Sequence, residues 1–117
     1  MDFDEAEKLK GEANTLFREQ KYDEACTKYF GAINAIRLNQ DLAKSQVGIN
    51  TMTACRNNLA MCKLKQKDYD SVIDQCERVL EHDPKNTKAV FRMSQAAFAL
   101  SQGVSVSQLK VALKYAT

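Results

Sequence analysis

The stretch that decides the fold is NLAMCKLKQKDYDSVIDQCERVLEHDPKN, residues 58 to 86. In its second half the apolar residues recur three and four positions apart, at Tyr69, Val72, Ile73, Cys76, Val79 and Leu80. This spacing predicts an amphipathic helix. The only proline of the chain, Pro84, follows the last of these residues, where it would stop the helix. Another helical stretch, at about 50–65, comes before this helix. The region therefore predicts a pair of helices.

The same helix pair occurs earlier in the chain. FREQKYDEA at 17–25 aligns with LKQKDYDSV at 64–72, a shift of 47 residues. Known helix-turn-helix repeats have a period of about 34 residues, so extra residues lie between the two pairs. They fit NQDLAKSQVGIN at 39–50, whose polar, glycine-containing composition predicts a lengthened helix end and a loop. A third unit follows at the plain period, with residues 88–100 matching 54–66.

These units resemble the tetratricopeptide repeat. Its signature positions are occupied in the first unit by Ala13, Tyr22, Ala25 and Ala32, and in the second by Leu59, Ala60, Tyr69, Val72, Val79 and Pro84. The resemblance implies an all-α fold of three helix-turn-helix repeats that form a right-handed α-solenoid with a concave peptide groove. Repeat 1 is expected at about 4–38, the insertion at 39–50, repeat 2 at 51–84 and repeat 3 at 85–117. The third departs from the pattern, and its apolar stripe passes to Val106, Leu109, Leu113 and Ala116.

The insertion and NLAMCKLK look most like the tetratricopeptide domain that follows the isomerase domain in large FKBP-type and cyclophilin-type immunophilins. Similar domains occur in protein phosphatases and chaperone-organising adaptors. Stacked repeats normally end in a polar helix that covers the last apolar face. Since no such capping helix is left in the sequence, we expect a single domain, 1–117, that is a fragment of a longer protein. Self-association through the uncovered last helix is one alternative for its oligomeric state, which we leave open.

The composition is that of a water-soluble globular protein, with 44% apolar and 27% charged residues. The longest apolar run, Ala96 to Leu100, is too short to span a bilayer, and the acidic start is unlike a signal peptide. We therefore expect a cytoplasmic protein, with a nuclear location left open. The net charge of +2 gives little support for a nucleic-acid or membrane partner.

The four cysteines, Cys26, Cys55, Cys62 and Cys76, lack metal-ligand spacing and lie on or beside apolar stripes. We expect small buried thiols, with neither metal nor cofactor. His82 beside Asp83 resembles half of a catalytic dyad, but a histidine at a helix end favourably meets the terminal carbonyls. We expect no catalytic residue and no enzyme activity in this chain. By their spacing, six methionine and aromatic side chains are expected to be mostly core: Met52, Met61, Met93, Phe17, Phe91 and Phe98.

Five polar residues of the first helices form the candidate site. Lys10 and Asn14, and likewise Lys88 and Arg92, are four residues apart and project from one helix face, and Asn58 lies on the helix between them. These five match, position for position, the carboxylate clamp of chaperone-binding tetratricopeptide domains. The resemblance implies that Lys10, Asn14 and Asn58 hold the terminal carboxylate of the EEVD peptide of heat shock protein 90 or 70. Lys88 and Arg92 would reach the aspartate side chain, and Phe17 is either core or an apolar contact for the peptide.

Three alternatives stay open at this stage. The lysines and arginines could be ordinary solvated surface charges. The domain could be a scaffold for an internal segment of another partner. It could also be the non-catalytic part of a peptidyl-prolyl isomerase. If the clamp is present, Lys10 and Arg92 are expected to face solvent.

Overall fold

The computed structural model describes residues 2–102, which form α-helices and contain no strand. The helices are α1 (Asp2–Arg18), α2 (Tyr22–Arg37), α3 (Gln40–Lys44), α4 (Gln46–Lys65), α5 (Tyr69–His82) and α6 (Thr87–Leu100). The predicted all-α repeat architecture is confirmed in this range. The remainder of the third repeat, with Val106, Leu109, Leu113, Ala116 and the uncovered last helix, lies outside the described residues.

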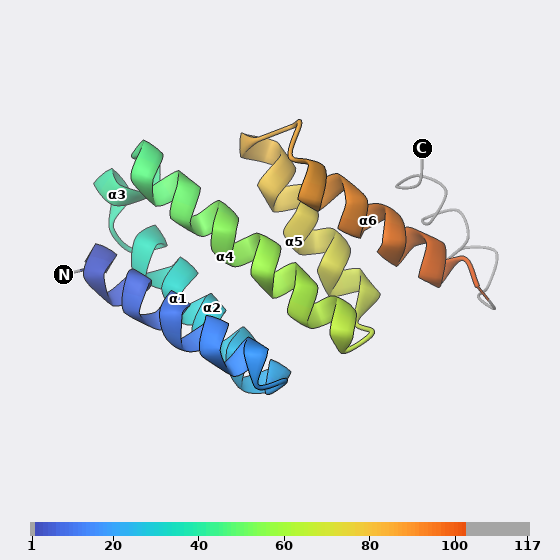
Figure 1. Cartoon of the computed structure of the whole chain (residues 1–117). Helices are drawn as coiled ribbons and strands as arrows, with labels where there is room; N and C mark the ends of the chain where they lie inside the picture. Colours follow the sequence, from blue (N-terminus) through green and yellow to red (C-terminus); the bar gives the residue numbers. More distant parts are fainter. Residues whose placement is uncertain (1, 103–117) are drawn as a thin grey trace.

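The helices pack as antiparallel neighbours in a stack that runs from α1 and α2 at the left of Figure 1 to α6 at the right. Helix α2 packs against both α1 and α4, and α5 packs against both α4 and α6. Helices α1, α4 and α6 therefore lie on one side of the stack. Side chains of these three helices can meet although they are far apart in the sequence.

The two hairpin turns have the same backbone conformation. Gln20 and Lys67, which are 47 residues apart, both have a positive φ, 63° and 61°. In each turn the next residue donates its N–H back to the helix that ends there: Lys21 N to Leu16 O, and Asp68 N to Lys63 O, both at 2.9 Å. This hydrogen-bonding pattern closes a helix with a left-handed residue. The shift of 47 residues aligned in the sequence is thus also the structural shift between the hairpins.

The insertion differs from the expected helix end and loop. Residues 40–44 form the short helix α3, and α4 begins at Gln46 rather than near residue 50. Two side chains start these helices: Asn39 Oδ1 accepts a hydrogen bond from Leu42 N at 3.1 Å, and Ser45 Oγ accepts one from Gly48 N at 3.0 Å. Such caps satisfy N–H groups that a helix start leaves unpaired. The polar residues of the insertion therefore serve as helix caps as well as connection.

The core consists of two clusters that meet at α4. One joins α1, α2 and α4, and the other joins α4, α5 and α6. Fully buried alanines, Ala13, Ala25, Ala32 and Ala60, allow the helices to approach closely. All four cysteines are buried free thiols, as expected.

The prediction that Phe91 and Phe98 belong to the core was wrong. Their side chains are 64% and 66% exposed. They are seven residues apart and so share one face of α6, whereas the opposite face, with Ala89, Met93 and Ala96, contacts the second core cluster. Met52 and Met93 are buried as expected. Within residues 2–102, no helix has the length and apolar character that crossing a membrane requires.

Candidate functional site

A pocket of about 270 Å³ lies where α1, α4 and α6 come together. It is lined by residues of α1, α2, α4 and α6: Asn14, Phe17, Arg18, Tyr29, Asn58, Met61 and Arg92. Helices α1, α4 and α6 thus each contribute at least one polar side chain that can donate hydrogen bonds. We call this the amide pocket, after Asn14 and Asn58.

The two amides of this pocket are held by a buried tyrosine. Asn58 Nδ2 donates a hydrogen bond to Asn14 Oδ1 at 3.2 Å, and the Tyr29 hydroxyl donates to the same oxygen. Tyr29 is 1% exposed, and burial raises the pKa of its phenol to about 12, so the hydroxyl stays protonated and remains a donor. Both lone pairs of Asn14 Oδ1 are then engaged. The two N–H groups of Asn14 are the part of this side chain left for a ligand.

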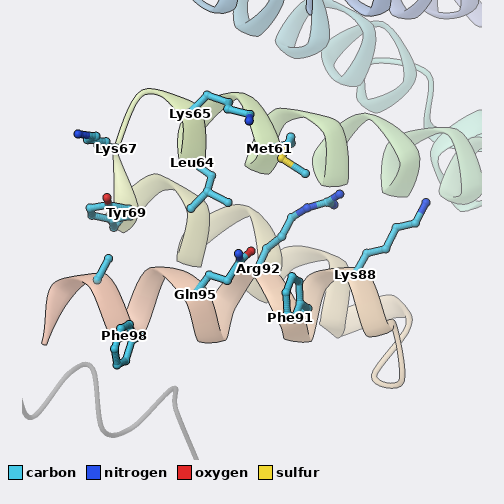
Figure 2. Close-up of a pocket in the computed structure, with 11 residues that line it drawn as sticks. Met61, Leu64, Lys65, Lys67, Tyr69, Lys88, Phe91, Arg92, Gln95 and Phe98 are labelled. Carbon is cyan, nitrogen blue, oxygen red and sulfur yellow. The ribbon is translucent and has the colours of Figure 1, made fainter.

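A second, larger pocket of about 740 Å³ continues between α4 and α6. Figure 2 shows Arg92 and Lys88 reaching from α6 towards α4, and Met61 and Leu64 on the facing side. Because Met61 and Arg92 line both pockets, we treat the two as one groove. The described residues that line it include the cations Arg18, Lys65, Lys67, Lys88 and Arg92, and no aspartate or glutamate. The groove therefore favours an anionic ligand.

The comparisons with known proteins agree with this architecture. The chain is 35% identical over 116 residues to the peptidyl-prolyl cis-trans isomerase FKBP42 of Arabidopsis thaliana, covering 95% of this chain and 32% of that protein. It superposes on the C-terminal tetratricopeptide-containing domain of a putative FK506-binding protein of Plasmodium falciparum with a TM-score of 0.73 and 28% identity, covering 98% of this chain and 76% of that one. This chain is a tetratricopeptide repeat domain of the immunophilin type.

A multi-domain immunophilin from Arabidopsis thaliana is similar as well, with a TM-score of 0.77 and 29% identity over 98% of this chain and 45% of that one. No family model matches the sequence. The tetratricopeptide domain spans about a third of the length of FKBP42. It corresponds to the repeat region of these proteins, as the domain from Plasmodium falciparum makes plain.

The tetratricopeptide fold brings some of the candidate clamp residues together and leaves one apart. Asn14, Asn58 and Arg92 line the amide pocket together with Phe17, and Lys88 is an exposed residue of the adjoining one. Lys10 lines neither of these pockets. It lies one turn before Asn14 on α1, and its Nζ pairs with Glu7 Oε2 at 3.0 Å. Lys10 is thus close to the groove but has a carboxylate partner of its own.

Arg92 is more deeply placed than the sequence indicates. It is half-buried rather than solvent-facing, and its Nη1 donates a hydrogen bond to the main-chain oxygen of Asn57 at 3.1 Å. Burial lowers the pKa of its guanidinium, which nevertheless stays charged near neutral pH. Arg92 therefore tethers α6 to α4 while it lines the groove.

The sequence reasoning missed several polar residues of the site, among them Arg18, Lys65 and Lys67, and the buried one is Tyr29. Its spacing in YDEACTKYF identifies it as a member of the apolar stripe of α2, which its burial bears out. A tyrosine rather than a phenylalanine at a fully buried position is the signal that could have found it, since a buried hydroxyl needs a hydrogen-bond partner.

Proposed function

We propose that the groove binds the C-terminal acidic peptide of a cytosolic chaperone, the EEVD tail of heat shock protein 90 or 70. In this proposal Lys10, Asn14 and Asn58 hold the terminal carboxylate. Lys88 and Arg92 contact the side chain of the terminal aspartate. The observation that carries the proposal is that Asn14 on α1, Asn58 on α4 and Arg92 on α6 line a single pocket.

The chemistry of the groove supports an acidic chain end. Among the residues that line it, side-chain N–H groups of asparagine, lysine and arginine are abundant, and no carboxylate competes for them. A terminal aspartate presents two carboxylates close together, which is the arrangement that dispersed amide and cationic donors can hold. The exposed aromatic Phe91 and the half-buried Phe17 add apolar surface for side chains further along the peptide.

The affinity is expected to be modest. Hydrogen bonds to charged groups contribute about 1.5 to 3 kcal/mol each, and the ordering of a flexible peptide offsets much of this. A micromolar complex, about −8 kcal/mol, follows. Because several of the cations are exposed, the affinity should fall as the salt concentration rises.

Titration with two peptides tests the proposal. We expect a free-acid EEVD peptide to bind at least about tenfold more tightly than the same peptide with an amidated C-terminus, because the amide removes a charged acceptor. Asn58→Ala should abolish most of this preference. Asn34→Ala, which removes an exposed asparagine side chain of α2, is the matched control and should keep it. Equal affinity for both peptides would instead favour a scaffold that binds an internal segment.

The relative FKBP42 is a peptidyl-prolyl isomerase, and we propose that the protein from which this domain comes is one too. Any isomerase activity then belongs to a region outside this chain. An assay of the domain alone on a prolyl peptide should give the uncatalysed rate. Turnover by the purified domain would show that the isomerase and the binding function are not separate.

A cytoplasmic location, with a nuclear one left open, is part of the same proposal because the chaperones named are cytosolic. Co-fractionation of the domain with such a chaperone from cytosol, lost on adding free-acid EEVD peptide, would support it. Association that free peptide does not displace would place the contact elsewhere on the domain.

A further inference from the structure

The side-chain oxygen of Asn14 accepts two hydrogen bonds, one of them from a buried residue. An asparagine side chain can present either its oxygen or its N–H groups, since rotation by half a turn exchanges them. The Tyr29 hydroxyl and Asn58 Nδ2 both donate to Asn14 Oδ1. The oxygen is therefore on the inner side, and the Asn14 N–H groups have no protein partner within residues 2–102.

Tyr29 is suited to impose this orientation because it lies beneath the pocket. Its ring is 1% exposed and belongs to the core cluster of α1, α2 and α4, so the hydroxyl has little freedom to move. It also lines the amide pocket, which puts the buried hydroxyl directly behind the two amides. Leaving that hydroxyl unpaired in the core would be costly.

We infer that Tyr29 is a positioning residue that makes Asn14 a hydrogen-bond donor to the groove, and that this determines the preference of the site for a carboxylate. A carboxylate only accepts hydrogen bonds, whereas a C-terminal amide also donates them. A site whose asparagine can present only N–H groups therefore favours a carboxylate over a C-terminal amide. The inference rests on the proposed function, since it concerns how that site recognises a chain end.

Removal of the hydroxyl should loosen this orientation without opening the core. In Tyr29→Phe the ring remains, but Asn14 can turn its oxygen towards the groove. One neutral hydrogen bond contributes about 0.5 to 1.5 kcal/mol, which corresponds to a loss of about two- to tenfold in affinity for the free-acid peptide. The affinity for the amidated peptide should stay the same, because an oxygen of Asn14 can accept from its N–H groups. The ratio of the two affinities should fall by the same factor.

The experiment measures both peptides with four variants. Tyr22→Phe is the matched control, since Tyr22 begins the same helix and its hydroxyl makes no hydrogen bond within residues 2–102; it should keep the wild-type ratio. Asn14→Ala and the double variant Tyr29→Phe/Asn14→Ala complete a double-mutant cycle. If Tyr29 acts through Asn14, Tyr29→Phe should change the ratio in the wild-type background and leave it unchanged in the Asn14→Ala background.

The outcomes separate the inference from the proposed function. If the wild-type domain does not distinguish the two peptides, the proposed function is wrong. If the wild-type domain distinguishes the two peptides and Tyr29→Phe keeps the same ratio of affinities, only the inference about Tyr29 is overturned. Should Tyr29→Phe fail to fold, nuclear magnetic resonance of the wild type decides. The Asn14 side-chain amide protons should then shift on adding the free-acid peptide and not the amidated one, and the absence of that difference overturns the inference.

Discussion

The guanidinium of Arg92 on α6 donates a hydrogen bond to the main-chain oxygen of Asn57 on α4, with 3.1 Å between Arg92 Nη1 and that oxygen. The residue after this acceptor, Asn58, lines the amide pocket that Arg92 also lines. A cation of the candidate site is thus anchored to the backbone beside one of its amides. Arg92 has a structural contact in addition to its proposed part in binding.

Arg92→Ala should therefore weaken both binding and folding. We expect a loss of about tenfold in affinity for the free-acid peptide and of about 1 kcal/mol in the free energy of unfolding, because a half-buried charge-assisted hydrogen bond is lost. Lys88→Ala is the control on the same helix. Lys88 is exposed, so this change should lower the affinity and leave the melting temperature unchanged. Equal melting temperatures for the two variants would contradict the tether.

Glu7 should act as an internal competitor for Lys10. Its carboxylate pairs with Lys10 at 3.0 Å, and both residues are half-buried at the surface. A surface ion pair is worth up to about 1 kcal/mol. If Lys10 belongs to the clamp, Glu7→Gln should raise the affinity for the free-acid peptide about two- to fivefold. Glu12→Gln removes the same charge from the same helix, but Glu12 pairs with Lys28, at 3.2 Å. Equal gains in both variants would mean that Lys10 has no direct part in binding.

The stability should fall in alkaline solution between about pH 9 and pH 12. Burial raises the pKa of Cys55 and Cys76 to about 11 and that of Tyr29 to about 12, from 9.0 for a thiol and 10.0 for a phenol. Above the ordinary pKa of a thiol or phenol, the unfolded chain loses these protons while the folded chain still holds them. Deprotonation therefore stabilises the unfolded state relative to the folded one. Each group can contribute at most about 1.4 kcal/mol per pH unit. In melting curves over this range, Cys76→Ala should flatten the decline; an unchanged slope would show that Cys76 does not titrate as described.

Two glycines should respond in opposite ways to alanine. A Cβ at Gly48 would overlap the main-chain oxygen of Leu42, whereas one at Gly11 would have no neighbour within 4 Å. Gly48→Ala should cost about 1 to 3 kcal/mol, because the corner between α3 and α4 must shift. Gly11→Ala should stabilise α1 by up to about 1 kcal/mol. Chemical denaturation measures both, and a neutral Gly48→Ala would mean that the corner is less tightly packed than the structure shows.

Much of the fold could be predicted from the sequence because its signals are local. The apolar spacing after Tyr22 and Tyr69 marks α2 and α5, and the alignment at 47 residues predicts the matching turns at Gln20 and Lys67. Helix α3 could not be found from spacing, since five residues do not complete a full repeat of an apolar stripe. Its capping residues, Asn39 and Ser45, can be recognised in the sequence. Polar residues between helices are equally typical of loops, however, so they do not predict a helix.

The site was less accessible to prediction because its geometry depends on how the helices cross. The resemblance indicated which residues face the groove, and Asn14, Asn58 and Arg92 do line one pocket, although their role in binding stays a prediction. The Arg92 contact requires the position of α6 relative to α4. The hydroxyl of Tyr29 meets Asn14 only because α2 packs behind α1 and α4. Neither relationship is encoded in spacing along one helix.

A crystal structure of the domain with the free-acid EEVD peptide is the most direct measurement. The account predicts a terminal carboxylate oxygen at about 2.7 to 3.2 Å from Asn14 Nδ2 and within hydrogen-bond reach of Asn58. The side chain of the terminal aspartate should then contact Arg92 or Lys88. A peptide that occupies the groove with its C-terminus directed away from both asparagines would contradict the account.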